Sequence, residues 1–295
     1  ARRRPFGRLN LEIREPMPAG RQMLVVLAGV GVGLIVSALM LMASGVGLGS
    51  LLNEFVVAIV TSPRNISAVL VYAAPLVIVG LSAALAFKAR FWNIGIEGQV
   101  IFGAIGATLV ANYDIGPPAT RLLLMGLFAA AAGMLWIALP LFLKLRLQVN
   151  EIISTLLMNY IAFNFLLHLL YGSWKDPQSA FPHSQIYDAA ERLTAYSWLG
   201  LNLSAVIALM LIAISAWLLG ASRFGFILNF VHSNPTMSRA LGVRVVQVTV
   251  AAALVSAAFA GLAGFAISSG IENRLTQSYF IGYGFSGILI AFLAR

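Results

Sequence analysis

The sequence predicts an all-α, polytopic membrane protein with about eight transmembrane helices. Apolar residues make up 60% of the 295 residues and charged residues only 10%, whereas soluble domains carry roughly 25% charged residues. The charged residues also gather in clusters, and the long runs between these clusters carry no charge. This composition argues against a water-soluble fold.

The uncharged runs are the predicted spans. Most of them reach the roughly 20 residues that cross a hydrocarbon core about 30 Å thick. The run at 98–113 is shorter, so we expect either a span with little tilt or a broken helix that borrows 94–99. In chain order, the eight expected spans are 22–53, 65–87, 98–113, 122–143, 152–174, 193–222, 245–271 and 275–294.

Residues 1–21 are expected to form a cytoplasmic tail, and 22–295 the transmembrane domain. The tail is rich in arginine and contains Pro5, Pro16 and Pro18, a composition that does not suit a folded domain. A cleaved signal peptide is the alternative for the first run, but the run is too long for a signal core and no A-x-A site follows. We therefore interpret it as a retained anchor.

Basic residues predict the orientation of the chain. The net charge of +9 would indicate nucleic acid only if the basic residues formed one surface patch, so no nucleic-acid partner is expected. If the N-terminus is cytoplasmic and the spans alternate, 14 of the 19 lysines and arginines fall in inside loops, as is typical of membrane proteins. The outside segments would then be 45–64, 112–120, 172–197 and 270–281, and the inside segments 1–21, 88–92, 144–149 and 222–245.

The chain lacks the residue sets that enzymes, metal sites and nucleotide-binding loops need. It has no cysteine, and its three histidines lie far apart, so no metal or other cofactor is expected. An ATP-binding P-loop needs a lysine that follows a glycine, and no lysine of this sequence does so. The chain is therefore not expected to be an enzyme, and any ATP hydrolysis that drives it would occur in another subunit.

The longest outside loop is expected at 172–196, with a short helix at 186–193. It contains two prolines and several acidic residues, which favour a connection between spans. The loop is either a simple connection or a docking surface for an extracytoplasmic binding protein.

Small residues recur within the predicted spans, at 29–33, 103–107 and 257–264. A missing side chain allows two membrane helices to approach closely. We expect these three segments to be helix contacts.

The segment 91–99 places polar residues and two glycines beside a hydrophobic span. Asn93, Glu97 and Gln99 are expensive to place in lipid, so we expect them to face protein or an aqueous path. The glycines permit the backbone breaks that are found at substrate sites in transporters. The alternative is a helix cap in which Asn93 satisfies free N–H groups, and the residues alone do not decide between the two.

A second polar segment opens the fifth predicted span. Its residues fall on two adjacent helical faces: Asn150, Ser154 and Met158 on one, and Glu151, Thr155 and Asn159 on the other. Hydrogen bonds between membrane helices contribute around 0.6–2 kcal/mol each, so interhelical bonding explains the pattern as well as pore lining does. If the segment lines a pore, Asn150, Glu151, Ser154 and Asn159 are its candidate path residues.

The loop at 222–245 contains a complete helix signal. Asn234 is a suitable N-cap, Pro235 fits the first helical position, and Gly242 can adopt the left-handed conformation that ends a helix. A helix over 235–241 is too short to persist alone in water. It therefore needs a partner surface.

These segments resemble signatures of the permease subunits of bacterial ABC importers, in the nucleoside-uptake branch of the branched-chain amino acid and sugar permease family. The first is 93–99 (Asn-Ile-Gly-Ile-Glu-Gly-Gln), and the second is 150–160 (Asn-Glu-Ile-Ile-Ser-Thr-Leu-Leu-Met-Asn-Tyr). The third is 234–243 with 256–264, which is similar to the family's Asn-Pro…Ala-Gly-Ile and small-residue stretches. The resemblance runs from about residue 65 to residue 295.

The chain departs from the family pattern at three positions. Asn229 and His232 stand where arginine and glycine are usual, and Ser286 stands where aspartate is common. These departures concern the identity of the solute rather than the class of protein.

The resemblance implies a permease of about ten spans that forms the path of an ATP-driven importer for a nucleoside or similar small polar solute. Its implied partners are an ABC ATPase with two nucleotide-binding cassettes, a second related permease, an extracytoplasmic substrate-binding lipoprotein and membrane lipid. The implied location is the bacterial cytoplasmic (inner) membrane, and we expect about two further C-terminal spans in relatives. Alternatives are a sugar or amino-acid permease of the same superfamily and a non-transporting membrane scaffold.

In such a permease, the helix at 235–241 is expected to be the coupling helix that contacts the ATPase. Its apolar residues share one face and would fill a groove, while Arg239 would meet a carboxylate on the partner. The candidate coupling residues are Asn234, Pro235, Met237, Arg239, Leu241 and Gly242.

Two short segments also suggest an inverted repeat with broken helices. Residues 94–98 and 283–287 share the order apolar, Gly, apolar, polar, Gly, and each opens a predicted span, from opposite sides of the membrane. Repeats related by an axis in the membrane plane have this property. Ser286 is therefore a further candidate path residue.

Overall fold

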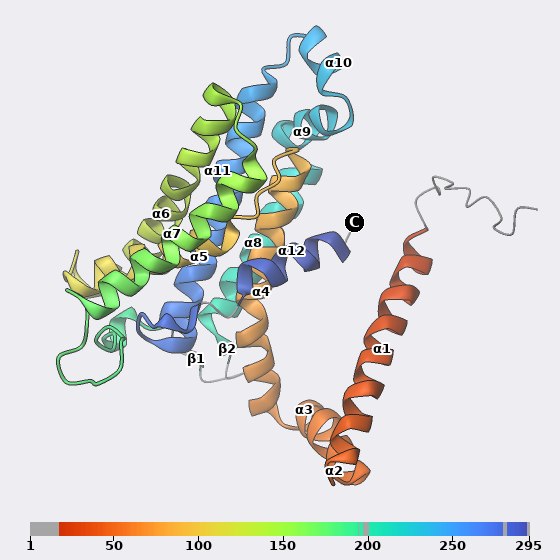
Figure 1. Cartoon of the computed structure of the whole chain (residues 1–295), viewed down its shortest axis with the longest axis vertical. Coiled ribbons are helices and arrows are strands. Elements are labelled where there is room, and N and C mark those ends of the chain that lie inside the picture. Colours follow the sequence, from red (N-terminus) through yellow and green to blue (C-terminus); the bar gives the residue numbers. More distant parts are fainter. Residues whose placement is uncertain (1–17, 194, 197–200, 280–281, 294–295) are drawn as a thin grey trace, which may run out of the picture. The chain divides into compact units, whose positions relative to one another are not determined.

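The computed structural model describes residues 18–193, 195–196, 201–279 and 282–293. The chain forms two compact units, Ala1–Thr61 and Ser62–Arg295, and both consist mainly of helices (Figure 1). The predicted all-α class is confirmed.

The first unit contains one long helix and one short apolar helical stretch. Helix α1 (Ala19–Ala43) ends at a turn in which Gly45 has a φ of +94°. A second stretch, Leu48–Thr61, then begins; it consists of α2 (Leu48–Leu52), a π-helical turn (Asn53–Val57) and α3 (Ala58–Thr61). The prediction of one span over 22–53 is therefore wrong, because a left-handed glycine cannot continue a right-handed helix.

The tail predicted at 1–21 is described only at its end. Residues 1–17 lie outside the described residues, and 19–21 already belong to α1.

The second unit contains the other helices. They are α4 (Pro63–Lys88), α5 (Ile96–Asn112), α6 (Pro118–Leu147), α7 (Glu151–Tyr171), α8 (Leu203–Gly220), α9 (Arg223–Ser233), α10 (Pro235–Ala240), α11 (Val245–Ile267) and α12 (Tyr283–Leu293). A π-helical turn, Ser268–Glu272, extends α11.

Six helices of the described chain are long and apolar enough to cross a membrane: α1, α4, α6, α7, α8 and α11. The shorter α5 and α12 occupy the third and eighth predicted spans. The chain is therefore a multi-pass membrane protein, as its uncharged runs predict.

Two predicted spans begin later than their uncharged runs. The sixth run starts at residue 193, but α8 starts only at Leu203, where Asn202 caps the helix by accepting a hydrogen bond from Ser204 N at 3.1 Å. Before this cap, β1 (Ala195–Tyr196) and β2 (Leu201–Asn202) pair as antiparallel strands. The eighth run starts at residue 275, but α12 starts at Tyr283. Apolar composition shows which residues can lie in the membrane. It does not show where a helix begins, because a cap decides that.

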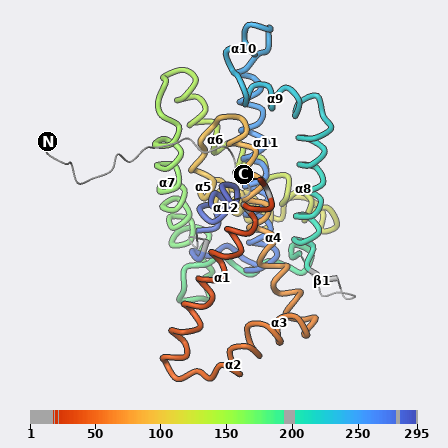
Figure 2. The backbone as a smooth tube through the Cα atoms, turned by 90° about the vertical axis from the view of Figure 1, so that its right-hand side faces the viewer, coloured from red at the N-terminus to blue at the C-terminus, as the bar shows by residue number. Residues whose placement is uncertain are grey.

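Helix α5 lies at the centre of the second unit. Most of its residues are buried, and it packs against α6, α7 and α11, while α11 also packs against α4. Figure 2 shows α5 between α6, α7 and α12. A helix that is apolar on all sides is expected to be buried on all sides, so α5 can be shorter than a lipid-facing span.

Glycines bring the backbones of α5, α6 and α11 into contact. A Cβ on Gly261 of α11 would overlap the carbonyl of Ala129 in α6, and a Cβ on Gly103 of α5 would overlap Gly261. Two of the three predicted small-residue contacts are thus confirmed. At the third, in α1, an added Cβ at the glycines meets no atom within 4 Å among the described residues.

This contact at Gly261 can be tested by adding one methyl group. Gly261→Ala is expected to lower the free energy of unfolding by about 1–3 kcal/mol, because the methyl must push two helices apart. Gly126→Ala is the matched control, since its Cβ would lie at an ordinary 3.5 Å from Phe265. Thermal unfolding in detergent measures both variants, and equal midpoints would contradict the close approach.

At one end of the second unit, which we call the loop end, residues 172–193 fold back over the extension of α11. Tyr187 N donates to Asn273 O at 2.9 Å. The helix predicted at 186–193 is only a 3-10 turn, Ala189–Glu191, because backbone groups of this segment bond to the α11 side instead of to one another.

Buried side chains hold the same loop to the bundle. Arg121 of α6 contacts Glu191 at 2.9 Å and Asp114 at 2.8 Å. The hydroxyl of Tyr187 lies 2.5 Å from Thr108 Oγ1 of α5, and burial raises the pKa of Tyr187 above its ordinary value. The hydroxyl therefore stays protonated, and the loop is a folded part of the unit.

The opposite end, which we call the α10 end, carries α9 and α10 (Figure 1). Asn234 Oδ1 accepts from Met237 N at 3.0 Å, Pro235 is the first helical residue, and Gly242 has a φ of +82°. The predicted capped helix is confirmed, although it ends at Ala240, one residue early. Helix α9 (Arg223–Ser233) was not predicted, because the whole of 222–245 was treated as a loop.

Helix α12 lies across α4 instead of beside it (Figure 1). Glycines permit this crossing: a Cβ on Gly287 would overlap Val79, and a Cβ on Gly80 would lie 3.2 Å from Ile290. The crossing places the first residues of α12 at the start of α5.

Candidate functional site

The connection between α4 and α5, residues 89–95, turns back into the bundle. Arg90 reverses the chain with a φ of +55°. Helix α5 then begins beside Trp136 of α6, since a Cβ on Gly98 would lie 2.7 Å from Trp136 Nε1. Trp136 precedes Leu147, the last residue of α6, by 11 positions or about 16 Å of helix. The N-terminus of α5 therefore lies well inside the bundle.

Irregular backbone at this depth must find its hydrogen-bond partners within the protein. Asn93 supplies some of them. Its Oδ1 accepts from Gly95 N at 3.0 Å, and its amide exchanges two hydrogen bonds with the amide of Gln99, at 3.1 and 3.2 Å. Asn93 is 0% and Gln99 1% exposed. Asn93 thus satisfies one free N–H group, that of Gly95, but it does not cap α5, because Gly95 is the N-cap and no side chain caps the helix.

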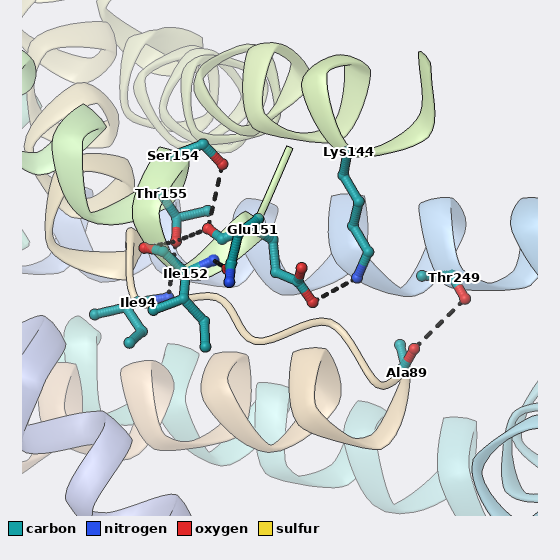
Figure 3. Close-up of polar contacts among 9 residues, drawn as sticks. Ala89, Ile94, Lys144, Glu151, Ile152, Ser154, Thr155 and Thr249 are labelled. Carbon is teal, nitrogen blue, oxygen red and sulfur yellow. Dashed lines mark hydrogen bonds and ion pairs between the residues drawn. The ribbon is translucent and has the colours of Figure 1, made fainter. Parts of the chain in front are cut away.

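Helix α7 supplies the remaining partners (Figure 3). Asn159 accepts from Gly98 N at 2.8 Å and donates to Ile94 O at 2.9 Å. Thr155 Oγ1 accepts from Ile94 N at 3.2 Å and donates to Glu151 O at 2.6 Å. One polar face of α7 thus meets the polar segment before α5, and its side chains bond to the backbone of Ile94 and Gly98.

Glu97 joins the N-terminus of α5 to the N-terminus of α12. Its Oε2 accepts from Gly284 N at 2.5 Å, and the side chain is 1% exposed. The first N–H groups of a helix have no partner within the helix, and Glu97 supplies one for α12. The segments 94–98 and 283–287 therefore contact each other here, while their relation as an inverted repeat stays a prediction.

The candidates at the start of α7 lie outside this cluster. Asn150 Oδ1 accepts from Ile152 N at 2.8 Å and caps α7. Glu151 pairs with Lys144 of α6, with 2.6 Å between Oε1 and Nζ, and Ser154 donates to the Glu151 carbonyl at 3.2 Å (Figure 3). These side chains cap α7 or join it to α6.

Helix α12 contacts the same connection at both of its ends. Ser286 lies on its first turn and is partly exposed. At its other end, the ring of Phe292 lies 5.1 Å from that of Phe87 and 5.8 Å from that of Trp92, measured between centroids.

The apolar residues of α10 face outward. Met237 is 52% and Leu241 64% exposed, whereas Ser238 is fully buried and donates to Asn234 O at 2.8 Å. Arg239 is also exposed. The chain therefore holds α10 by its capped start and leaves the side chains of Met237 and Leu241 exposed.

The structure brings four predicted path residues into one buried cluster: Asn93, Glu97, Gln99 and Asn159. It adds two residues that were not predicted as part of the site: Gly284, whose N–H donates to Glu97, and Trp136, which lies beside Gly98. Gly284 carried a signal in its repeat motif, but Trp136 meets the site only through the tertiary fold.

Comparisons with known proteins agree on the class. The family described as "Branched-chain amino acid transport system / permease component" matches residues 65–295. A glucose ABC transporter permease protein of Haloferax volcanii is 33% identical over 97% of this chain and 78% of its own length. A guanosine ABC transporter permease protein of Bacillus subtilis is 33% identical over 92% and 79%. A nucleoside ABC transporter permease protein of Lactococcus lactis subsp. cremoris is 26% identical over 92% and 78%.

No solved structure matches the chain. The family match covers nearly all of the second unit, including the α5 cluster, α10 and α12. The chain therefore belongs to the family of permease components of branched-chain amino acid transport systems.

Proposed function

We propose that this chain is the permease subunit of an ATP-driven ABC importer for a nucleoside or a similar small polar solute. One observation carries the substrate: the guanosine permease that is 33% identical over 92% of the chain. A permease also accounts for irregular backbone and buried polar groups inside a membrane bundle, which are typical of transporter substrate regions. A non-transporting scaffold would not need them.

A sugar importer is the second candidate, because the glucose permease relative is also 33% identical, over 97% of the chain. The two substrates differ in chemistry, since a nucleoside carries an aromatic base and glucose carries only hydroxyl groups. A direct comparison of uptake separates them.

Uptake by intact cells tests the substrate. The chain is produced with its partner subunits in bacterial cells that lack their own nucleoside uptake, and the cells receive labelled guanosine or labelled glucose. We expect guanosine to accumulate and unlabelled nucleosides, but not glucose, to compete. Accumulation of glucose alone would favour the second candidate, and accumulation of neither would contradict both.

The translocation path is proposed to pass the junction of α5 and α12. Two short helices meet there by their N-termini, at Glu97 and Gly284, and half-helix N-termini that face a polar solute recur in transporters. Asn93, Gln99 and Asn159 would hold the α5 side of the path, and Ser286 lies on the α12 side. Nearer the α10 end, the proposed path residues are Asn150, Glu151 and Ser154.

The proposed partners occupy opposite ends of the second unit. An ABC ATPase with two nucleotide-binding cassettes would bind the exposed face of α10, and a second related permease would complete the path. An extracytoplasmic substrate-binding lipoprotein would dock at the loop end, where a cavity of about 340 Å³ is lined by Tyr113, Asp114, Trp174 and Lys175 among others.

The α10 end and the N-terminus are proposed to be cytoplasmic in a bacterial inner membrane. Since the chain has no cysteine, single cysteines test this without a background signal. Gln178→Cys at the loop end is expected to react with an impermeant thiol reagent in intact cells. Thr236→Cys in α10 is expected to react only after lysis. The reverse pattern would overturn the orientation.

A further inference from the structure

Two side chains fasten the end of α9 to the end of α4. Arg90, just after α4, donates from Nε to the His232 carbonyl at 2.7 Å and from Nη2 to the Ser233 carbonyl at 3.4 Å. These are the last two residues of α9. A guanidinium suits this position, because free carbonyls at a helix C-terminus carry partial negative charge.

The contact is reciprocal. His232 Nδ1 lies 3.0 Å from the carbonyl of Lys88, the last residue of α4. A carbonyl oxygen can only accept, so Nδ1 carries the hydrogen. The last carbonyls of α9 thus accept from Arg90, which follows α4, and the last carbonyl of α4 accepts from His232 of α9.

The backbone and the core around this contact are fixed as well. Arg90 has a φ of +55°, a conformation that a non-glycine residue keeps only where its surroundings enforce it. A buried apolar cluster lies beside Arg90; it consists of Ala89, Leu228 of α9 and Ala252 of α11. Thr249 of α11 also donates to the Ala89 carbonyl at 3.4 Å (Figure 3).

The same connection leads directly to the candidate path. Only Phe91 and Trp92 separate Arg90 from Asn93, and Phe91 is completely buried. On the other side of the contact, α10 follows α9 after a single residue, Asn234. A displacement of α10 therefore reaches the start of α5 through α9 and Arg90, without passing through a flexible loop.

We propose that Arg90 and His232 form a rigid joint that transmits movement of α10 to the α5–α12 junction. The inference rests on the proposed function, in which α10 receives the motion of the ATPase. Arg90 and His232 are positioning residues in this account, since neither contacts the proposed path. Without these two side chains, ATP should still be hydrolysed but less solute should be transported. The chain should still fold and bind the ATPase.

The joint is tested in the complete transporter by measuring uptake and ATP hydrolysis on the same preparation. Arg90→Ala and His232→Ala are expected to assemble with the ATPase normally but to lower the solute moved per ATP by roughly tenfold. The double variant should be no worse than either single variant, because both residues belong to one contact. Arg146→Ala is the control, since Arg146 is exposed and has no hydrogen bond or ion pair to a described residue.

A second test replaces the hydrogen bonds between the ends of α4 and α9 with a covalent link. Lys88→Cys with His232→Cys, joined by a short thiol cross-linker, is expected to transport nearly as well as the wild type, because the two helix ends move as one body. Loss of transport on cross-linking, or an unchanged uptake-to-ATP ratio in Arg90→Ala, would overturn the joint. A wild-type complex without ATP-dependent uptake would instead contradict the proposed function, and this role with it.

Discussion

Replacing Met237 and Leu241 with aspartate is expected to abolish both uptake and co-purification of the ATPase, while the permease stays folded in the membrane. The two side chains are 52% and 64% exposed, so the chain's own core does not depend on them. In a complex they would be buried at the centre of a small contact. Truncating such anchors typically costs about 2 kcal/mol or more each, and a buried unpaired carboxylate adds a desolvation penalty. Together these effects weaken binding by more than about a hundredfold.

The control variant keeps volume and polarity. Met237→Leu with Leu241→Met should preserve uptake, because volume-conserving swaps are tolerated in apolar contacts. Fluorescence size-exclusion of detergent extracts checks the fold of both variants. Normal ATPase co-purification and normal uptake in the double aspartate variant would exclude α10 as the coupling helix.

Replacing Asn159 with alanine is expected to destabilise the second unit by about 2–6 kcal/mol, at about 1–3 kcal/mol for each buried group left without a partner. The substitution leaves two such backbone groups, Gly98 N–H and the Ile94 carbonyl, without the hydrogen bonds that they make now. Thermal or denaturant unfolding of the purified protein measures the loss.

A second asparagine of α7 provides the control. Asn164 is exposed and donates only within its own helix, to the Tyr160 carbonyl at 2.8 Å. Asn164→Ala is therefore expected to stay within about 0.5 kcal/mol of the wild type. If Asn159→Ala were as stable as this control, Asn159 would not hold the α5 connection, and the pore-lining interpretation alone would remain.

The sequence predicted local features of the site well. Asn234, Pro235 and Gly242 specify a capped helix through interactions within a few residues, and the structure has that helix. For the polar segment before α5 the sequence left two interpretations open, a backbone break and a helix cap, and the structure has irregular backbone there with Gly95 as the N-cap. Both signals depend on chemistry between neighbours in sequence.

The sequence could not predict contacts that depend on the arrangement of the bundle. Glu97 and Gly284 are 187 positions apart, and only the crossing of α12 over α4 brings them together. The Arg90–His232 contact also depends on where α9 packs. Helix α9 itself was missed because 222–245 was treated as one loop between two uncharged runs, although Leu228 and Val231 of α9 are buried.

Helix ends were the weakest part of the predicted topology. An uncharged run shows which residues can enter a membrane, but a cap or a left-handed glycine decides where the helix stops. Gly45 divides the first run, and Asn202 delays the sixth. Instead of eight full spans, the described residues contain six helices long enough to cross a membrane and three shorter apolar helices, Leu48–Thr61, α5 and α12.

The most direct test of the account is uptake by the purified transporter in proteoliposomes. The vesicles hold the chain with its ATPase and second permease, with ATP inside and the loaded binding protein outside. We predict that guanosine accumulates against its gradient with ATP inside, and not with ADP or a non-hydrolysable analogue. Guanosine that equilibrates equally without ATP hydrolysis, or ATP that is hydrolysed while no solute enters, would contradict the claim that this chain is the path of an ATP-driven importer.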